Sequence, residues 1–127
     1  MQLQPLAVTL DLINDNVHFS GALRDLAPID IDYTSPIDDG HGYTSLELFL
    51  MSLASCLGTS MLLVLRKMHK TVMGCRIQAQ GTRCTEHPTC FETVAVDIEF
   101  VSADATEGDV QRALALSEST LCPVWAM

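Results

Sequence analysis

The sequence predicts an α+β fold in which antiparallel sheets cover a long central helix. Apolar and polar residues alternate over 8–12, 17–23 and 29–33 and again over 75–83 and 93–100, the period of half-buried strands. Between these regions, residues 46–65 form a nearly continuous apolar run. At 127 residues the chain has the length of a single domain, spanning 1–127, with one hydrophobic core.

The N-terminal region predicts three short strands. Residues 8–12 and 17–23 alternate on either side of the polar turn 14–16, which indicates an antiparallel hairpin. Residues 29–33 alternate in the same way, and we expect their acidic side chains, Asp30 and Asp32, to point outward. Residues 35–42 are rich in Pro, Gly and Asp and predict a loop.

A long helix follows this loop. Thr44 and Glu47 have the spacing of a capping box, and the helix is expected to run from Ser45 to about His69. Its surface is apolar nearly all round through Leu65, and basic residues gather in its last turn. A buried helix is favoured over a membrane span, because the run contains Glu47 and several small polar residues. One sheet cannot cover such a helix, so we expect it to pack against a second copy of itself in a homodimer.

The C-terminal region predicts a second hairpin and a second helix. Strands over 75–83 and 93–100 are joined around Glu86-His87-Pro88. Thr106 and Asp109 have capping-box spacing, and apolar residues from Val110 to Leu121 recur with helical period. Pro123 is expected to end this helix, which leaves Cys122 on non-helical backbone.

Charge and cysteine content restrict the class of protein. Seven Lys and Arg stand against sixteen Asp and Glu, and the net charge of −9 disfavours nucleic acid and anionic membranes as partners. Five cysteines cannot all pair within one chain, and the polar start at residues 1–5 is unlike a secretory signal peptide. We therefore expect a cytoplasmic, reducing location.

Two cysteines carry the main functional hypothesis. Cys56 lies in the apolar helical run, and Cys122 lies late in the chain directly before Pro123. This layout is typical of an attacking thiol and a resolving thiol, so redox chemistry is the leading interpretation. Alone, a cysteine in an apolar helix would be interpreted as inert packing.

Several segments resemble the OsmC/Ohr-like family over residues 35–127. They are Ser45–Cys56, Leu65–Met68, Gly81–Arg83 with Glu86–Pro88 and Phe91, and Ala115–Val124. The resemblance implies an OsmC-like fold, an intertwined homodimer with long central helices wrapped by sheets. It also implies a thiol-dependent peroxidase that reduces organic hydroperoxides or hydrogen peroxide at the dimer interface. Cys56 would attack the peroxide, Cys122 would resolve the sulfenic acid, and a dithiol reductant would reopen the disulfide, with no cofactor or metal ion.

Two further residues are candidates for the same site. Arg83 shares the strand parity of the core-facing residues, so it either faces inward to lower the pKa of Cys56 or is turned outward by a bulge at Gly81. Arg24 is the other candidate cation. Glu47 matches the region where the family's peroxidase branch has a functional glutamate, but it also fits a capping role. Ideal helix geometry places Glu47 on the opposite face from Cys56 and ~13.5 Å away.

Weaker patterns leave other functions open. Cys84, His87 and Cys90 form a C-x2-H-x2-C pattern that supplies three zinc ligands, with Cys75 as a remote fourth. His41 either lines a substrate entrance or is a solvated loop residue, and Trp125 is expected to be a packing or interface residue. A non-enzymatic dimer of the same fold, which binds a small hydrophobic molecule or senses oxidants, is the main alternative to the peroxidase.

Overall fold

The structure is a computed structural model, and it describes residues 3–127. The chain forms two compact units, residues 1–48 and 49–127, and each is described by itself. The long helix α1 (Ser45–Lys67) begins in the N-terminal unit and continues in the C-terminal unit.

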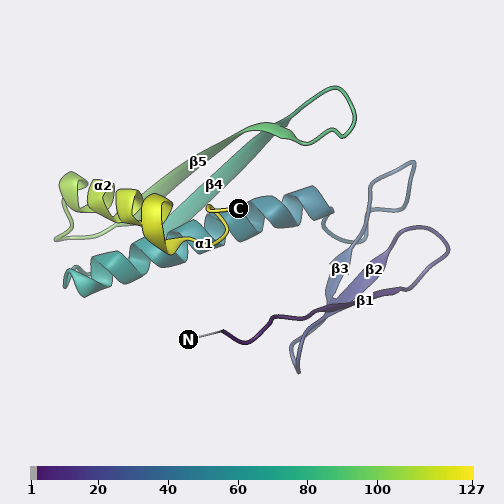
Figure 1. Ribbon diagram of the computed structural model, residues 1–127, viewed down its shortest axis with the longest axis horizontal. Helices are drawn as coiled ribbons and strands as arrows, with labels where there is room; N and C mark the ends of the chain where they lie inside the picture. The colour runs from purple at the N-terminus through teal and green to yellow at the C-terminus, as the bar shows by residue number, and fades with distance from the viewer. Residues whose placement is uncertain (1–2) are drawn as a thin grey trace. The chain divides into compact units, whose positions relative to one another are not determined.

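The N-terminal unit contains an antiparallel sheet with strand order β1-β2-β3 (Figure 1). Its strands are β1 (Thr9–Leu12), β2 (Phe19–Ala22) and β3 (Ile29–Ile31). Thr9 is paired with Ala22, and Phe19 with Ile31. The polar turn closes because the Asn14 side-chain oxygen accepts hydrogen bonds from the backbone N–H groups of Asn16 and His18. The structure therefore has the three strands that the alternation predicted, in shorter form.

The outward orientation expected for Asp32 is wrong. Asp32 is completely buried, whereas Asp30 is exposed as expected. Strand β3 ends before Asp32, and its carboxylate accepts hydrogen bonds from the backbone N–H groups of Tyr33, at 2.7 Å, and His41, at 2.9 Å. The loop after β3 thus turns the Asp32 side chain inward, where its carboxylate accepts hydrogen bonds from backbone N–H groups of that loop.

A second buried carboxylate fastens this loop to the β1–β2 turn. The Asp38 carboxylate accepts hydrogen bonds from Asn14 Nδ2, at 2.9 Å, and from the Val17 backbone N–H, at 3.0 Å. These hydrogen bonds, of which the one from Asn14 has the largest effect, hold the pKa of the Asp38 carboxyl group well below its usual range. The loop is therefore an ordered part of the N-terminal unit.

Helix α1 begins and ends as its sequence predicts. Glu47 Oε1 accepts a hydrogen bond from the Thr44 N–H at 2.8 Å, and Thr44 Oγ1 accepts one from the Glu47 N–H at 3.2 Å, which completes the capping box. After Lys67 the chain leaves the helix through His69, which has a left-handed φ of 62°. The expected end near His69 is therefore within two residues of the observed end.

In the C-terminal unit, a long hairpin lies along α1 (Figure 1). Its strands are β4 (Gly74–Arg83) and β5 (Phe91–Val101), and they pair from Gly74–Val101 to Arg83–Phe91. The helix approaches the sheet closely at Gly58, where an added Cβ would lie 2.4 Å from Ile77 Cδ1. A side chain at position 58 would therefore require the end of the Ile77 side chain to move.

The second helix completes the core. Helix α2 (Glu107–Leu116) begins with the predicted capping box of Thr106 and Asp109, and one π-helical turn, η1 (Ser117–Leu121), follows it. The buried core residues come from α1, α2 and the segment after η1: Leu57, Met61, Val64, Leu65, Ala113 and Cys122. Half-buried residues of β5, Val96, Ile98 and Phe100, pack against this cluster.

Helix α1 keeps a partly exposed apolar surface. Phe49, Met51 and Leu63 have exposed fractions of 43%, 47% and 60%. By length and composition alone α1 would be able to cross a membrane, a criterion that the core helix of a soluble protein also meets. Residues of α1 on one side of the helix are buried in the core of the C-terminal unit. The apolar side chains on its other side remain partly exposed to solvent.

Candidate active site

The candidate site is a pair of thiols brought together by tertiary structure. Cys56 lies in the middle of α1, and Cys122 directly follows η1. Their Sγ atoms are 3.0 Å apart, and the Cys122 S–H donates to Cys56 Sγ. Both residues lie in the C-terminal unit, and both thiols are free. The pair that sequence context singled out is therefore in direct contact.

The π-helical turn positions Cys122. The Cys122 N–H donates to the Ser117 carbonyl at 2.9 Å, one residue further back than in an α-helix. Buried Ser117 donates its hydroxyl to the Ala113 carbonyl at 2.8 Å, which ties the turn to α2. Cys122 then has extended backbone (φ −86°, ψ 105°), as the following proline predicted. Its side chain thereby enters the core beside α1.

Trp125 contributes to the site through its backbone. Its N–H donates to Cys122 Sγ at 3.4 Å, while its side chain is 42% exposed. The sequence suggested only a packing or interface role for this residue. The contact depends on the turn after Pro123, in which the Ala126 N–H donates to the Cys122 carbonyl. No residue-type signal in the sequence marks such a backbone contact.

The two thiols differ in environment. Cys122 is only 3% exposed, whereas Cys56 is half-buried at the edge of the core. Burial has the largest effect on the pKa of Cys122 and raises it, and the hydrogen bond with Cys56 raises it further. Cys122 therefore keeps its proton and is the donor in the contact between the two thiols. A small molecule from solvent therefore meets Cys56 first.

The predicted cations do not contact this pair within the described chain. Arg83 is exposed at the end of β4, where it donates from Nε to the Thr89 carbonyl at 2.7 Å. Thr82 pairs with Thr93 and Arg83 pairs with Phe91, so Glu92 of β5 is left out of the pairing, and the alternation that predicted an inward side chain does not extend to Arg83. Arg24 is an exposed loop residue of the N-terminal unit with a left-handed φ of 53°. Among residues 3–127, no hydrogen bond or ion pair joins a cationic side chain to Cys56.

Glu47 is occupied in the capping box at the start of α1. The hydrogen bonds from Thr44 lower the pKa of its carboxyl group, so Glu47 is ionised at neutral pH. The capping interpretation is thus confirmed. A catalytic role for Glu47 stays a prediction.

The zinc pattern is not assembled as a ligand set. Within residues 3–127, no group of three or more His, Cys, Asp or Glu side chains is arranged to hold a metal ion. Cys84 and Cys90 nevertheless lie close together in the β4–β5 hairpin, with Sγ atoms 3.9 Å apart. Cys75 is exposed at the start of β4, on a strand position whose parity predicted burial.

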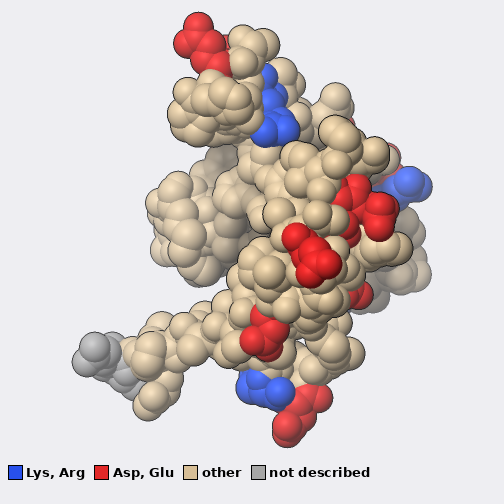
Figure 2. Space-filling view, turned by 90° about the vertical axis from the view of Figure 1, so that its right-hand side faces the viewer, with Lys and Arg blue, Asp and Glu red and all other residues tan. Residues whose placement is uncertain are grey.

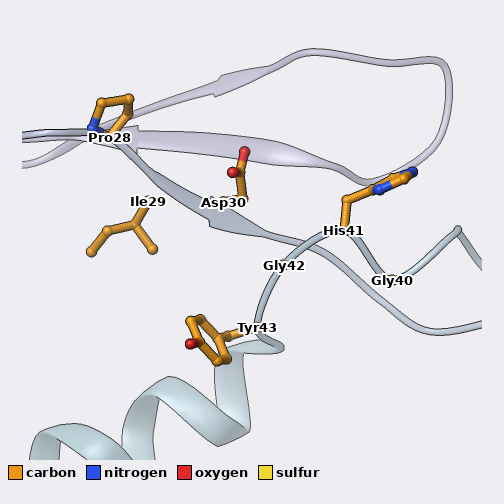
Figure 3. Close-up of a pocket in the computed structure, with 7 residues that line it drawn as sticks. All are labelled: Pro28, Ile29, Asp30, Gly40, His41, Gly42 and Tyr43. Atoms are coloured by element: carbon orange, nitrogen blue, oxygen red, sulfur yellow. The ribbon is translucent and has the colours of Figure 1, made fainter.

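His41 lines a hollow in the N-terminal unit. The hollow has a volume of about 480 Å³ and is lined by Pro28, Ile29, Asp30, Gly40, His41, Gly42 and Tyr43 (Figure 3). The His41 ring stacks on His18, with centroids 5.8 Å apart, and His18 Nε2 lies 2.9 Å from Asp30 Oδ1. The His41 ring is therefore stacked on His18 of the β1–β2 connection, although His41 itself is exposed.

Surface charge agrees with the acidic composition. On the face drawn in Figure 2, Asp and Glu side chains are spread over the surface and few Lys and Arg side chains appear. A net charge of −9 repels polyanions and leaves small neutral molecules unaffected. The fold and the paired thiols together define an α+β protein with a candidate redox site.

Comparison with known proteins assigns the family. The sequence model for "OsmC-like protein" matches residues 38–127, and the chain therefore belongs to the OsmC-like family. Among curated proteins, none matches this sequence. The family membership and the mixed α+β architecture inferred from the sequence are thus confirmed.

Solved structures share the fold. A hypothetical protein from Aquifex aeolicus VF5 is 25% identical, with a TM-score of 0.82 over 98% of this chain and 87% of that chain. An OsmC-like protein from Mycoplasma pneumoniae is 17% identical, with a TM-score of 0.80 over 97% and 86%. The organic hydroperoxide resistance protein OhrB of Bacillus subtilis is 18% identical, with a TM-score of 0.64 over 98% and 90%.

Proposed function

We propose that this protein is a thiol-dependent peroxidase that reduces organic hydroperoxides or hydrogen peroxide through Cys56 and Cys122. The 3.0 Å separation of the two sulfur atoms carries the proposal, because 66 positions separate these residues in the sequence. Similarity to structures that include organic hydroperoxide resistance proteins supports the choice of substrate class.

The roles of the two thiols follow from their environments. The Cys56 thiolate attacks the O–O bond of the hydroperoxide, becomes a sulfenic acid and releases the alcohol, or water from hydrogen peroxide, after protonation. The Cys122 sulfur then attacks Cys56 Sγ, forms the disulfide and releases water. A dithiol reductant returns both residues to thiols by exchange. Because a disulfide bond is ~2.05 Å long, the two sulfur atoms need to approach by about 1 Å more.

Burial of Cys122 suits it to the second step. Its raised pKa keeps the thiol protonated while Cys56 reacts with peroxide, so the two thiols do not compete for the same oxidant. Cys56 is only half-buried, so a small peroxide can reach its sulfur.

We also propose that the functional unit is a homodimer in a reducing, cytoplasmic compartment. The exposed apolar residues of α1, Phe49, Met51 and Leu63, support burial against a second copy. A dimer would also bring charged residues of a second chain to the thiol pair, and Arg83 and Arg24 are the candidate cations. Sedimentation should show a dimer at micromolar concentration, and a stable monomer would contradict the assembly.

The catalytic proposal is tested with three cysteine variants. Cys56→Ser should abolish peroxide consumption. Cys122→Ser should consume one equivalent of cumene hydroperoxide and leave a dimedone-reactive sulfenic acid on Cys56, because the resolving thiol is gone. Cys75→Ser, at an exposed cysteine of the same unit, is the matched control and should keep full turnover. Full turnover by Cys56→Ser would exclude the mechanism.

One observation favours the non-enzymatic alternative, a dimer that binds a small hydrophobic molecule. The N-terminal unit contains an apolar hollow of about 240 Å³, whose lining includes Leu10, Leu23, Ile31 and Leu48. This volume lies just below the ~300–1,000 Å³ of typical ligand pockets, so the hollow would suit only a very small apolar ligand. If the wild-type protein loses no thiols on exposure to peroxide, ligand binding at this hollow becomes the leading function.

A further inference from the structure

The β4–β5 hairpin carries a second pair of thiols that the proposed peroxidase does not use. Cys84 and Cys90 lie opposite each other next to the last paired residues, Arg83 and Phe91. Their Sγ atoms are 3.9 Å apart, and the Cys84 N–H donates to the Cys90 carbonyl at 2.8 Å. Opposed residues of antiparallel strands have Cα atoms ~4.5–5.5 Å apart, within the ~4.4–6.8 Å range of disulfides.

Neighbouring contacts hold the two cysteines in this arrangement. Arg83 directly precedes Cys84, and Thr89 directly precedes Cys90. The Arg83 guanidinium donates to the Thr89 carbonyl at 2.7 Å and also to the Thr89 hydroxyl. The Cys90 N–H donates to the Pro88 carbonyl at 2.7 Å. The backbones on both sides of the pair are therefore fixed, and closing a bond requires mainly side-chain rotation.

The pair is accessible to small molecules. Cys90 is exposed, whereas Cys84 is half-buried and lines a hollow of about 220 Å³ together with Arg83, Thr85, Glu86 and Glu92. This position contrasts with that of Cys122, which is closed off in the core. A soluble thiol or disulfide can therefore reach this pair without any movement of the core.

We propose that Cys84 and Cys90 form a second redox site, which a low-molecular-weight disulfide converts into an intramolecular disulfide across the hairpin. The Cys90 thiolate attacks the small disulfide, which gives a mixed disulfide on Cys90 and releases one small thiol. Cys84 then gives up its proton and attacks Cys90 Sγ, which closes the internal disulfide and releases the second small thiol. Two cysteine thiols are oxidised, one small disulfide is reduced, and no other oxidant is needed.

The order of attack follows from exposure. Cys90 is the more exposed thiol, and the contact with Cys90 raises the pKa of Cys84, which therefore stays protonated during the first step. The closed disulfide would fix the end of the hairpin that carries Arg83. This inference is independent of the peroxidase proposal, because neither Cys56 nor Cys122 takes part.

The test uses the full-length Cys56→Ser/Cys122→Ser protein, which keeps Cys75, Cys84 and Cys90 of the five cysteines. After exposure to oxidised glutathione, peptide mass spectrometry should find a Cys84–Cys90 disulfide without bound glutathione, while Cys75 stays a thiol or a mixed disulfide. With Cys84→Ser added, Cys90 should instead retain glutathione. Because ring closure is intramolecular, the mixed disulfide should last at least about ten-fold longer in that variant than with the pair intact.

Two outcomes would overturn the proposal. One is the accumulation of separate glutathione adducts on Cys84 and Cys90 when both are present. The other is an equal lifetime of the Cys90 adduct with and without Cys84. Circular dichroism on each variant checks that the hairpin remains folded, and Cys75→Ser provides a control that should change neither result.

Discussion

Replacing Gly58 with alanine tests whether the close approach between α1 and β4 determines the packing of the C-terminal unit. The new Cβ would lie 2.4 Å from Ile77 Cδ1 and 3.8 Å from Ile77 Cγ1. Non-bonded carbon atoms rest ~3.5–4.0 Å apart, so the Ile77 terminal methyl group must move by about 1 Å. The clash involves that methyl group alone, because the Cγ1 distance is already an ordinary contact.

The magnitude follows from two opposing effects. Overpacking of this kind destabilises a protein by ~1–3 kcal/mol. Alanine in place of glycine inside a helix stabilises it by about 1 kcal/mol. We therefore expect Gly58→Ala to lower the free energy of unfolding by about 0–2 kcal/mol. In an Ile77→Val background, which lacks Cδ1, the same change should be neutral or stabilising by up to about 1 kcal/mol.

A double-mutant cycle separates these effects. Wild type, Gly58→Ala, Ile77→Val and the double variant are unfolded in urea at one protein concentration, since association would shift the apparent stability. The expected coupling free energy between positions 58 and 77 is ~1–3 kcal/mol. A coupling below about 0.5 kcal/mol would refute the reasoning, because the two substitutions would then be independent.

Two further predictions concern charge. Arg83→Met should slow iodoacetamide alkylation of Cys56 near pH 6.5 if Arg83 supplies positive charge to the thiol pair, and an unchanged alkylation rate would remove it from the site. The lowered pKa of Asp38 stabilises the folded state above the unfolded value of ~3.9, and this stability is lost as the pH falls toward the folded value. Asp38→Asn should therefore be less stable than wild type at pH 7, with the difference shrinking below about pH 4. Urea unfolding at both pH values measures it, and a difference independent of pH would show that the charge has no part.

Local sequence signals predicted the regular structure well. Both capping boxes, at Thr44 and Thr106, depend on residues three positions apart, and both form as expected. The alternation over 75–83 and 93–100 predicted the β4–β5 hairpin because packing on one face requires a period of two. The contexts of Cys56 and Cys122 identified the pair of thiols, although their contact depends on the tertiary fold.

Long-range and backbone effects escaped the sequence interpretation. Asp32 is buried because it binds the His41 N–H, which comes from a loop whose path the alternation does not specify. Arg83 is exposed at the end of β4, where the pairing with β5 becomes irregular, and the alternation of residue types gives no sign of that irregularity. The C-x2-H-x2-C spacing suggested metal ligands, whereas the hairpin brings only its two cysteines together.

The π-helical turn at Ser117–Leu121 has a consequence for how this sequence can change during evolution. Removing one residue from 118–121 would let the chain continue as an α-helix, which costs little in local hydrogen bonding. It would also rotate everything after the turn by ~100° about the helix axis. Cys122 would then leave Cys56, although every cysteine would still be present. Under the proposed function, the length of this segment therefore matters as much as the two cysteines, and a deletion here should abolish peroxide turnover as the loss of either cysteine would.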